Sequence, residues 1–523
     1  MKDIINDFEV TKFIKFFRDK SDDFRPLDDD LSYLDNDDFK NTGYLGEIEF
    51  SSTEKLLIVS AEVQNNLTER SGKKKQYELA KRILSQNACN SGIFIFYDGT
   101  GSFRFSLVYS DPVGTKVNWS TFRRFTYFVS KEQTNKTFIN RVENADYSSL
   151  ENLKDAFSIE KVNKEFYKSI SDLFFQLTGD EEYGYKRLIK LPDVSKEDDK
   201  TFQEFAVRLI GRIIFCWFLK HKKSIQDIPL IPPALLSSTA VKNYPNYYHT
   251  VLEPIFFEAL NKPLKEKKPL NLPEAEHIPF LNGGLFEAHR EDFYHPLNIN
   301  TLKIPDTWFL DLFSVLEQYN FTIDENSPVD TEISVDPEML GRIFENLLAA
   351  INPETGKSAR KETGSYYTPR EIVDYMVHQS LLEYLKDKTK LDENTLNQLL
   401  AYDGDSQSTL PSNDITSIID ALDDIKVLDP ACGSGAFPMG ILQKMVNVLE
   451  KVDPDSSIWR KKILSGITDP AAKKFTESQL KNNKDQLNYI HKLGIIRKSI
   501  YGVDIQPIAT DISKLRFFLS LVV

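Results

Sequence analysis

The pattern of apolar and polar residues near the N-terminus predicts a small α/β domain. Four runs have the alternation or the aliphatic content of strands, and a helix separates the second run from the third. The strand-like runs are residues 44–50, 55–63, 92–97 and 103–109, and the helix covers residues 76–85. Asp98 and Gly99, between the last two runs, are typical of a tight hairpin turn. Residues 43–145 are therefore predicted to form strand, strand, helix, strand, strand.

Helical periodicity dominates the middle of the chain. Residues 166–177 and 202–220 carry apolar side chains at helical spacing. A shorter helix at residues 7–18 precedes an Asp-rich loop. We predict a multidomain α/β protein. Its predicted divisions are residues 1–42 (N-terminal helix and acidic loop), 43–145 (α/β domain), 146–330 (helical connector) and 331–523 (a last domain).

Composition and charge favour a cytoplasmic protein with a local nucleic-acid surface. The 523 residues carry a net charge of −13, which argues against a wholly basic nucleic-acid binder, although residues 70–82 and 104–141 are basic. The longest apolar stretch, residues 205–219, contains two arginines and is too short to span a bilayer. The N-terminus has no signal-peptide core, and the three cysteines have no metal or disulfide spacing.

A glycine-rich turn near residue 430 is the clearest candidate for a ligand site. An apolar run at residues 425–428 ends in Asp429, and a helix is expected from about Phe437. Gly433 and Gly435 lack Cβ atoms, so backbone can approach a ligand at the helix N-terminus. The third glycine of a dinucleotide fingerprint is absent, and an acid in the turn suits a cationic or hydroxyl-bearing ligand better than a pyrophosphate. A purely structural turn is the alternative.

Two further stretches support a ligand at this turn. Tyr366 and Tyr367 stand before a helix that Thr368 and Pro369 are predicted to begin, and adjacent tyrosines can close over a planar ligand. Packing of both tyrosines in the core is the alternative. The short strand at residues 499–504 ends in an acid, the usual partner of ribose hydroxyls.

The N-terminal domain resembles the core of PD-(D/E)xK nucleases in the order of its elements. That chemistry needs acids on adjacent strands to hold Mg²⁺, and a lysine or a polar substitute to orient water. Glu62 ends the second strand and Gln64 takes the lysine position, so these are the candidate catalytic residues. The upstream acid is Glu47, Glu49 or Glu54, and we take Glu62 and Glu49 as the candidate metal ligands. The alternative is a degenerate nuclease fold that only grips DNA.

Basic residues of this domain are candidates for contacts with double-stranded DNA. Lysine and arginine suit phosphate groups, and aromatic neighbours suit stacking on bases. The candidates are Arg70, Lys73, Lys74, Lys75, Arg123 and Arg124, the last two near Trp119, Phe122 and Phe125. For any one of them, an ordinary solvated surface position is the alternative.

Three motifs resemble those of γ-type amino-methyltransferases that act on DNA adenine. Residues 363–369 (Thr-Gly-Ser-Tyr-Tyr-Thr-Pro), 429–437 (Asp-Pro-Ala-Cys-Gly-Ser-Gly-Ala-Phe) and 501–505 (Tyr-Gly-Val-Asp-Ile) resemble motifs X, I and II. The helix at 340–348 (Leu-Gly-Arg-Ile-Phe-Glu-Asn-Leu-Leu) and the turn at 280–287 (Phe-Leu-Asn-Gly-Gly-Leu-Phe-Glu) are similar to type IIG restriction–modification proteins. In that family, nuclease, helical connector and methyltransferase share one chain.

The resemblance implies a Rossmann-like methyltransferase domain that binds S-adenosylmethionine at the ends of its strands. Asp429 and the glycine backbone would hold the methionine part, Asp504 the ribose hydroxyls, and Ile505 the adenine. The implied cofactor-binding residues are Gly364, Tyr366, Tyr367, Thr368, Pro369, Asp429, Ala431, Gly433, Gly435, Phe437, Asp504 and Ile505. The implied reaction is methylation of adenine N6 in DNA, with Mg²⁺-dependent cleavage by the N-terminal domain.

One departure from the family concerns the catalytic motif. The tetrapeptide Asn/Asp-Pro-Pro-Tyr/Phe, which holds the flipped base, does not occur in the sequence. We therefore expect the N-terminal part of an enzyme with an incomplete methyltransferase domain, as a truncated or split gene product or as the first subunit of a two-chain enzyme whose second polypeptide carries the catalytic motif and the target-recognition domain. This chain alone is not expected to transfer a methyl group. The alternative is a non-catalytic DNA-binding or assembly component of a phage-defence system. A small-molecule methyltransferase is disfavoured, because it would not need the basic N-terminal unit.

Overall fold

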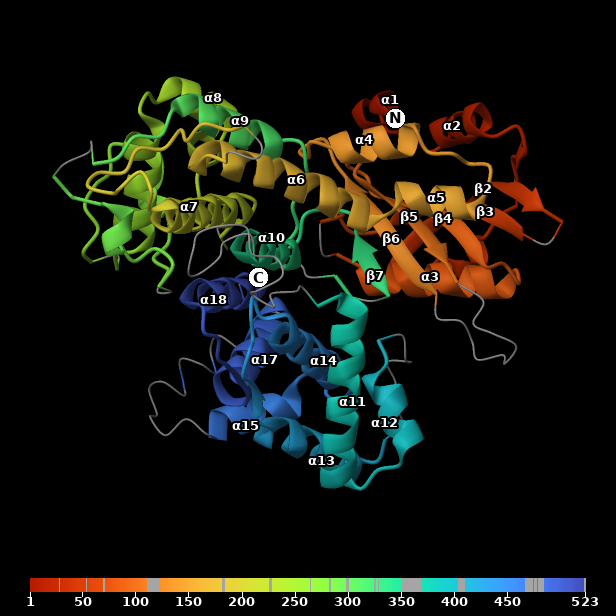
Figure 1. The fold of residues 1–523 in the computed structure, drawn as a ribbon. Helices are drawn as coiled ribbons and strands as arrows, with labels where there is room; N and C mark the ends of the chain where they lie inside the picture. The colour runs from red at the N-terminus through yellow and green to blue at the C-terminus, as the bar shows by residue number, and fades with distance from the viewer. Residues whose placement is uncertain are drawn as a thin grey trace. The chain divides into compact units, whose positions relative to one another are not determined.

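The chain forms two compact units in a computed structural model (Figure 1). One unit comprises Met1–Lys168 and Val315–Asp336, and the other comprises Ser169–Ser314 and Pro337–Val523. The structure describes residues 1–27, 29–52, 54–68, 71–110, 122–180, 184–224, 228–263, 265–281, 284–297, 301–323, 326–327, 329–349, 368–402, 410–465, 474, 477 and 484–521. The chain passes between the units within α6 (Ile159–Thr178), within α9 (Asp306–Leu316) and after Asp336.

A seven-stranded mixed sheet forms the centre of the first unit, and its strands lie in chain order from β1 to β7. The strands are β1 (Phe24–Arg25), β2 (Phe39–Ser51), β3 (Glu54–Val63), β4 (Ser91–Tyr97), β5 (Phe103–Tyr109), β6 (Arg123–Val129) and β7 (Asp330–Glu332). β3 pairs in parallel with β4, and β6 with β7, while the other neighbouring pairs are antiparallel. The four predicted strands fall within β2 to β5, and the expectation of a mixed α/β fold is confirmed.

Both faces of this sheet are covered, which explains why its inner strands are aliphatic rather than strictly alternating. In β3, Leu56 and Ile58 join one apolar cluster, while Leu57 and Val59 join another. Successive strand residues point to opposite faces, so each face has its own core. α3 (Lys73–Gln86) packs into the second cluster. The other helices of this unit are α1 (Lys2–Asn6), α2 (Lys12–Lys20), α4 (Lys136–Glu143) and α5 (Leu150–Ala156), with a 3-10 turn at Ser32–Leu34.

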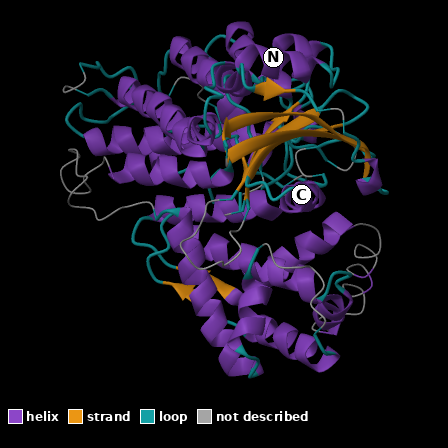
Figure 2. Ribbon diagram, turned by 90° about the vertical axis from the view of Figure 1, so that its right-hand side faces the viewer, coloured by secondary structure: helices purple, strands orange, loops and turns teal. Residues whose placement is uncertain are grey.

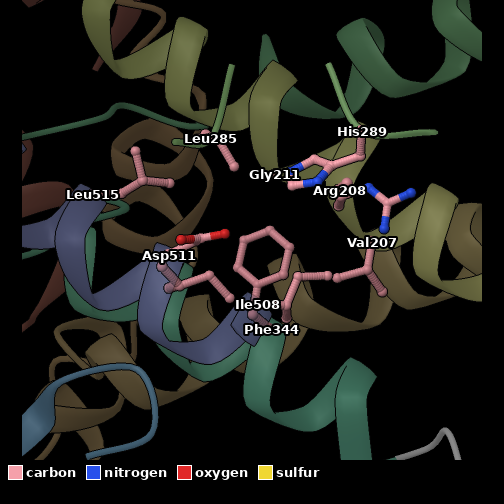
Figure 3. A pocket seen from close by; sticks show the side chains of 10 residues that line it. Val207, Arg208, Gly211, Leu285, His289, Phe344, Ile508, Asp511 and Leu515 are labelled. Carbon is pink, nitrogen blue, oxygen red and sulfur yellow. The ribbon is translucent and has the colours of Figure 1, made fainter. Parts of the chain in front are cut away.

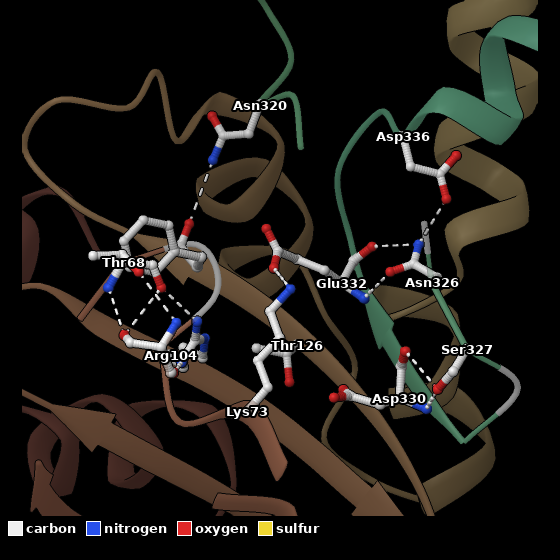
Figure 4. A network of polar contacts seen from close by, with 12 residues as sticks. Thr68, Lys73, Arg104, Thr126, Asn320, Asn326, Ser327, Asp330, Glu332 and Asp336 are labelled. Atoms are coloured by element: carbon white, nitrogen blue, oxygen red, sulfur yellow. Dashed lines mark hydrogen bonds and ion pairs between the residues drawn. The ribbon is translucent and has the colours of Figure 1, made fainter. Parts of the chain in front are cut away.

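A buried arginine holds the chain segment that leads into α3 (Figure 4). Arg104 of β5 is fully buried, and its Nη2 donates to the carbonyl oxygen of Thr68 at 2.5 Å. Its Nη1 donates to Ser71 O at 2.6 Å and to Gln76 Oε1 at 3.0 Å. A charge removed from water needs such partners, because an unmatched buried charge is strongly destabilising. The segment after β3 is therefore fixed by a side chain from β5.

Ion pairs attach β7 to the edge of the sheet (Figure 4). Arg124 of β6 is fully buried and donates twice to the Asp330 carboxylate, at 2.9 and 2.6 Å. Lys73 of α3 pairs with Glu332 at 2.7 Å. Burial raises the pKa of Asp330, but the charge and hydrogen bonds of Arg124 outweigh burial and hold that pKa below its usual value. The strand is thus attached to residues far earlier in the chain by paired charges.

The second unit is helical around a small parallel sheet, whose two short strands Figure 2 shows among the helices. β8 (Val427–Asp429) pairs with β9 (Ile500–Gly502). Three helices pack on one another, and these are α7 (Asp199–Lys220), α10 (Pro337–Ala349) and α18 (Pro507–Leu521). A second group shares one apolar core and comprises α11 (Arg370–Thr389), α12 (Glu393–Leu400), α13 (Ser412–Asp424), α14 (Ala436–Val452), α15 (Ser457–Ser465) and α17 (Lys484–Ser499).

The second unit also contains several short helical segments. They are α8 (Ser238–Asn243), 3-10 turns at Pro233–Leu235, Ala275–His277 and Arg290–Asp292, and π-helical segments at Tyr248–Leu252 and Pro254–Leu260. α7 contains the apolar stretch at residues 205–219, whose side chains are largely buried, and Arg212 in its middle holds Asp292 through two contacts of 2.9 Å. Among the helices that the structure describes, none has both the length and the apolar character required to cross a membrane.

His491 of α17 makes the second unit sensitive to acid. Its ring is 3% exposed, and neither ring nitrogen has a hydrogen-bond partner among the described residues. Burial lowers the pKa of His491 to about 4. The unfolded chain, with an ordinary pKa, binds a proton first, so stability is full above the unfolded pKa and falls with pH below it.

We predict that wild type loses roughly 2–3 kcal/mol more stability than His491→Phe between about pH 7.5 and pH 4.5. Phenylalanine fills the site without a titratable group, so this part of the pH dependence should disappear. Urea unfolding at both pH values measures the difference. Equal pH dependence in the two proteins would contradict the assignment.

Candidate functional site

The parallel pair of β8 and β9 brings two acids to one edge of a sheet. Val427 lies opposite Ile500, and Asp429 lies opposite Gly502. Asp504 follows the end of β9 by two residues. Because the strands are parallel, their carboxyl ends share an edge, which is where open α/β sheets bind ligands.

Backbone hydrogen bonds join the glycine turn to the loop after β9. Val503 N donates to Asp429 O at 2.9 Å, and Cys432 N donates to Val503 O at 3.0 Å. Gly433 N donates to Asp504 Oδ2 at 3.0 Å. The end of β8, the turn and the acid after β9 therefore form one connected structure.

Asp429 has spare hydrogen-bonding capacity. Its Oδ1 accepts from Ala431 N at 3.1 Å. Its Oδ2 is buried and has no hydrogen-bond partner within the described parts of the chain. Burial, followed by the negative charges of Asp429 and Asp504, raises the pKa of Cys432 to about 11. The turn therefore lies in a negative field that suits a cationic group.

The two glycines of the turn are required by packing within the protein. Gly433 and Gly435 have φ values of +51° and +86°, a region that residues with a Cβ rarely adopt. A Cβ on Gly433 would lie 2.8 Å from Glu345 Oε1, and a Cβ on Gly435 would lie 2.4 Å from Ser513 Oγ. Side chains of helices α10 and α18 thus pack closely against the turn.

Ser434 is enclosed by side chains from these two helices. Its backbone N–H and its hydroxyl both donate to Glu345 Oε1, at 3.0 and 2.7 Å. Arg516 Nη1 donates to Ser434 O at 3.0 Å. Ser434 is fully buried. Sequence reasoning did not select Glu345 or Arg516, because each lies more than 80 residues from Ser434 and no local pattern links them.

The other implied cofactor residues are described only in part. Thr368 and Pro369 directly precede α11. Phe437, in the first turn of α14, packs against the apolar core of the second helical group. Ile505 is 97% exposed. Three residues of the implied lid lie outside the described residues, and these are Gly364, Tyr366 and Tyr367.

Exposed apolar side chains follow the small sheet. Leu428 and Tyr501 are register partners on β8 and β9, and both are exposed. Val503 and Ile505 continue the two-residue spacing beyond β9 and are also exposed. Parallel sheets are normally covered on both faces, so this apolar strip is unusual for a protein surface.

A small cavity lies between α7, α10 and α18 (Figure 3). Phe344 and Asp511 face it from α10 and α18, and Arg208 faces it from α7. Its volume is about 20 Å³, which is room for about one water molecule. A nucleoside cofactor does not fit, so the strand ends of β8 and β9 are the better candidate for ligand binding.

Glu62 lies at the carboxyl end of β3, close to a second acid. It stands opposite Lys40 of β2 and Tyr97 of β4. Asn41 bridges Glu62 and Asp35, because its Nδ2 donates to Glu62 Oε2 at 2.6 Å and its backbone N donates to Asp35 Oδ2 at 3.0 Å. Burial and then the charges of Glu62 and Asp35 raise the pKa of Tyr97.

The expected pairing of Glu49 with Glu62 is corrected by the strand register. β2 and β3 are antiparallel, and Glu49 lies opposite Lys55, seven residues before Glu62. At about 3.3 Å per residue the two positions are roughly 23 Å apart, too far to share a metal ion. Glu49 instead pairs with Arg25 at 3.0 Å. Asp35, which Asn41 links to Glu62, lies just before β2, and the antiparallel hairpin could have predicted that end.

Gln64 and the alternative acid Glu47 lie at different places along the hairpin. Gln64 is exposed just after β3, and its N–H donates to Asp38 O at 3.0 Å. Glu47 lies opposite Leu57 and pairs with Lys55 at 3.2 Å. Within the described residues there is no group of three or more histidine, cysteine or acidic side chains placed to hold a metal.

The basic candidates divide between surface and interior. Lys74 and Arg123 are exposed. Lys75 pairs with Asp38 at 2.5 Å. Two candidates, Lys73 and Arg124, are engaged by the acids of β7, and Arg124 is fully buried. Arg70 lies outside the described residues, and so does Trp119, the predicted aromatic neighbour of Arg123 and Arg124.

Comparison with known proteins supports the resemblance that the motifs indicate. The chain is 29% identical over 399 residues to the Methanocaldococcus jannaschii protein named "Putative type II restriction enzyme and methyltransferase RM.MjaORFECS2P". The match covers 69% of this chain and 30% of that protein, so the chain spans less than a third of its relative's length. The predicted resemblance to restriction–modification enzymes is confirmed. No protein-family model matches the chain.

A solved structure shares a distant likeness. It is the type IIL restriction–modification enzyme MmeI in complex with DNA, at 16% identity and a TM-score of 0.36. The likeness covers 68% of this chain and 36% of that chain.

We predict that Gly435→Ala lowers the stability of the second unit by at least about 2 kcal/mol, because the left-handed backbone and the contact with Ser513 both oppose a Cβ. Gly43→Ala is the control, because a Cβ there meets nothing within 4 Å. It should stay within about 0.5 kcal/mol of wild type. Thermal unfolding of the three proteins measures both. A Gly435→Ala protein as stable as the control would contradict the described packing.

Proposed function

We propose that this chain is part of a restriction–modification enzyme that methylates adenine N6 in DNA with S-adenosylmethionine. The observation that carries the proposal is the pair of acids at the ends of β8 and β9, with Asp429 Oδ2 buried and without a partner among the described residues. The cofactor carries an ammonium group, a sulfonium group and two ribose hydroxyls. A negative site with free acceptor capacity suits all of these.

Particular residues would hold particular parts of the cofactor. Asp504 would accept hydrogen bonds from the ribose hydroxyls, and Asp429 would hold the methionyl ammonium group. Ile505 is exposed at the same strand end and would pack on the adenine ring. The bound cofactor supplies a methyl group on a positively charged sulfur. The role of the chain is to orient that group and to exclude water around it.

The exposed strip beside this site supports a larger methyltransferase domain. A two-stranded parallel sheet of three-residue strands cannot bury its own apolar side chains. We propose that further strands, on the same longer protein or on a second polypeptide, cover Leu428 and Tyr501 and carry the catalytic Asn/Asp-Pro-Pro-Tyr/Phe motif. Double-stranded DNA is the proposed substrate, and exposed Lys74 and Arg123 are proposed phosphate contacts.

Asp429→Asn should weaken binding of S-adenosylmethionine at least about tenfold, which corresponds to about 1.4 kcal/mol. The substitution keeps the shape of the side chain and removes its charge. Isothermal titration calorimetry measures the dissociation constant. Asp420→Asn, at an exposed site on α13, is the matched control and should bind like wild type. Unchanged affinity in Asp429→Asn would remove Asp429 from the site.

A second proposed activity is Mg²⁺-dependent DNA cleavage by the first unit. The observation that favours it is the proximity of Asp35 and Glu62 at the end of parallel strands β3 and β4, where a PD-(D/E)xK core would hold its metal. Mg²⁺ usually takes one or two carboxylates and several waters. Gln64, which stands at the lysine position, would orient the attacking water by hydrogen bonding without a charge.

Asp35→Asn and Glu62→Gln should each abolish plasmid cleavage in Mg²⁺ or Mn²⁺ and weaken Mn²⁺ binding at least about tenfold, because each removes one carboxylate ligand. Glu49→Gln, at the other end of the hairpin, should keep both properties. Gel assays and calorimetry measure them. Loss of metal binding and cleavage in both Glu49→Gln and Glu62→Gln, but not in Asp35→Asn, would instead support the pairing of Glu49 with Glu62. Equal traces of cutting in all variants would favour a fold that only grips DNA.

A further inference from the structure

Helix α10 presents one face to the pieces of the candidate cofactor site. Glu338, Gly341 and Glu345 are spaced three and four residues apart, so they lie on the same side of the helix. Glu338 forms an ion pair with Arg370, the first residue of α11. Glu345 holds Ser434 in the glycine turn. A single helix therefore contacts both the turn and the helix that follows the implied lid.

Helix α10 packs so closely against the glycine turn that the helix itself has a glycine, Gly341, at the point of contact. A Cβ on Gly341 would lie 2.6 Å from Ser434 Oγ and 3.2 Å from Arg516 Nη1. Glycine in a helix interior is destabilising relative to alanine, so its presence there is consistent with a close approach of helix to turn. The approach lets the Glu345 carboxylate reach the Ser434 backbone.

Carboxylates of the protein itself lie at the turn that leads into α14. The first N–H groups of a helix lack partners within the helix, and the helix dipole favours a negative charge there. In the turn before α14, Ser434 N donates to Glu345, Gly433 N donates to Asp504, and Gly435 N, at the N-cap, donates to Cys432 O. Glu345 and Asp504 therefore bring two negative charges close to the N-terminal end of this helix.

We propose that Glu345 is a positioning residue for the cofactor, because its carboxylate fixes the conformation of the glycine turn from a separate helix. The proposal rests on the proposed binding of S-adenosylmethionine. Glu345 acts through Ser434, which has its N–H, hydroxyl and carbonyl all held. With the turn fixed, Asp429 and Asp504 keep their separation, and the ligand group over the turn is cationic rather than anionic.

The reach of the side chain, more than its charge, is the property that this role requires. A single oxygen, Oε1, accepts both hydrogen bonds from Ser434. Glu345→Gln keeps such an oxygen at the same distance from the backbone and removes the charge. Glu345→Asp keeps the charge but shortens the side chain by one methylene. The two variants separate a positioning role from a purely electrostatic one.

The test measures binding of S-adenosylmethionine and of its neutral product, S-adenosylhomocysteine, by calorimetry on the 523-residue chain. Glu345→Gln should bind S-adenosylmethionine within about threefold of wild type, and Glu345→Asp should bind it at least about tenfold more weakly. The product should follow the same order, because the turn is displaced for both ligands. Glu450→Gln, at an exposed position on α14, is the matched control and should behave as wild type.

Amide hydrogen exchange of the peptide covering residues 429–437 tests the hydrogen bonds without any ligand. Exchange should be faster in Glu345→Asp than in wild type and nearly unchanged in Glu345→Gln. Wild-type affinity and exchange in Glu345→Asp would overturn the proposal, and so would a loss of affinity confined to Glu345→Gln. If wild type binds neither ligand, the proposed function itself falls and the positioning role falls with it.

Discussion

The candidate site of the second unit depends on the parallel pairing of β8 with β9. Only three residue pairs join the strands, yet they set Asp429 beside Gly502 and bring the following Asp504 to the glycine turn. The pairing is reinforced at its carboxyl end, where Val503 N reaches Asp429 O and Cys432 N reaches Val503 O. A sheet this small is not stable alone, so its geometry is supplied by the helices packed around it. The tertiary structure thus sets the positions of Asp429 and Asp504, and the sequence provides the carboxylate groups.

The antiparallel register of β2 and β3 has the corresponding role in the first unit. The strands themselves could be predicted, because covered strands are rich in aliphatic residues and the turn at Asp98 and Gly99 is local. The partner of Glu62 was predicted at the wrong end of the hairpin. Because β2 runs antiparallel to β3, the residues near Glu62 are those at the beginning of β2 and not those at its end. Asp35 is therefore close to Glu62, whereas Glu49 is not. β7 could not be predicted either, because three residues joined by ion pairs leave no periodic pattern.

The glycine turn illustrates how far a motif determines a site. The sequence correctly located a strand, a turn and a helix between residues 425 and 452. It assigned both glycines to the approach of a ligand, whereas their missing Cβ atoms also admit Glu345 and Ser513. The two explanations are compatible, since a turn with positive φ values has more than one open side. The residues of such a motif are therefore constrained by every contact that the motif makes. Only the three-dimensional structure distinguishes contacts within the protein from positions that are open to a ligand.

The basic residues of the first unit also show that sequence alone does not separate exposed side chains from buried ones. Arg123 and Arg124 are adjacent in sequence, but side chains alternate across a sheet, so one is exposed and the other is buried against Asp330. Buried arginine here attaches β7, and β7 leads through Asp336 directly into α10. The stretch from 330 to 345 therefore carries both the acids that bind β6 and α3 and the acid that holds the glycine turn. Asp330 is fixed to β6 within the first unit and Glu345 to the glycine turn within the second, so this one short stretch contributes to the structure of both units.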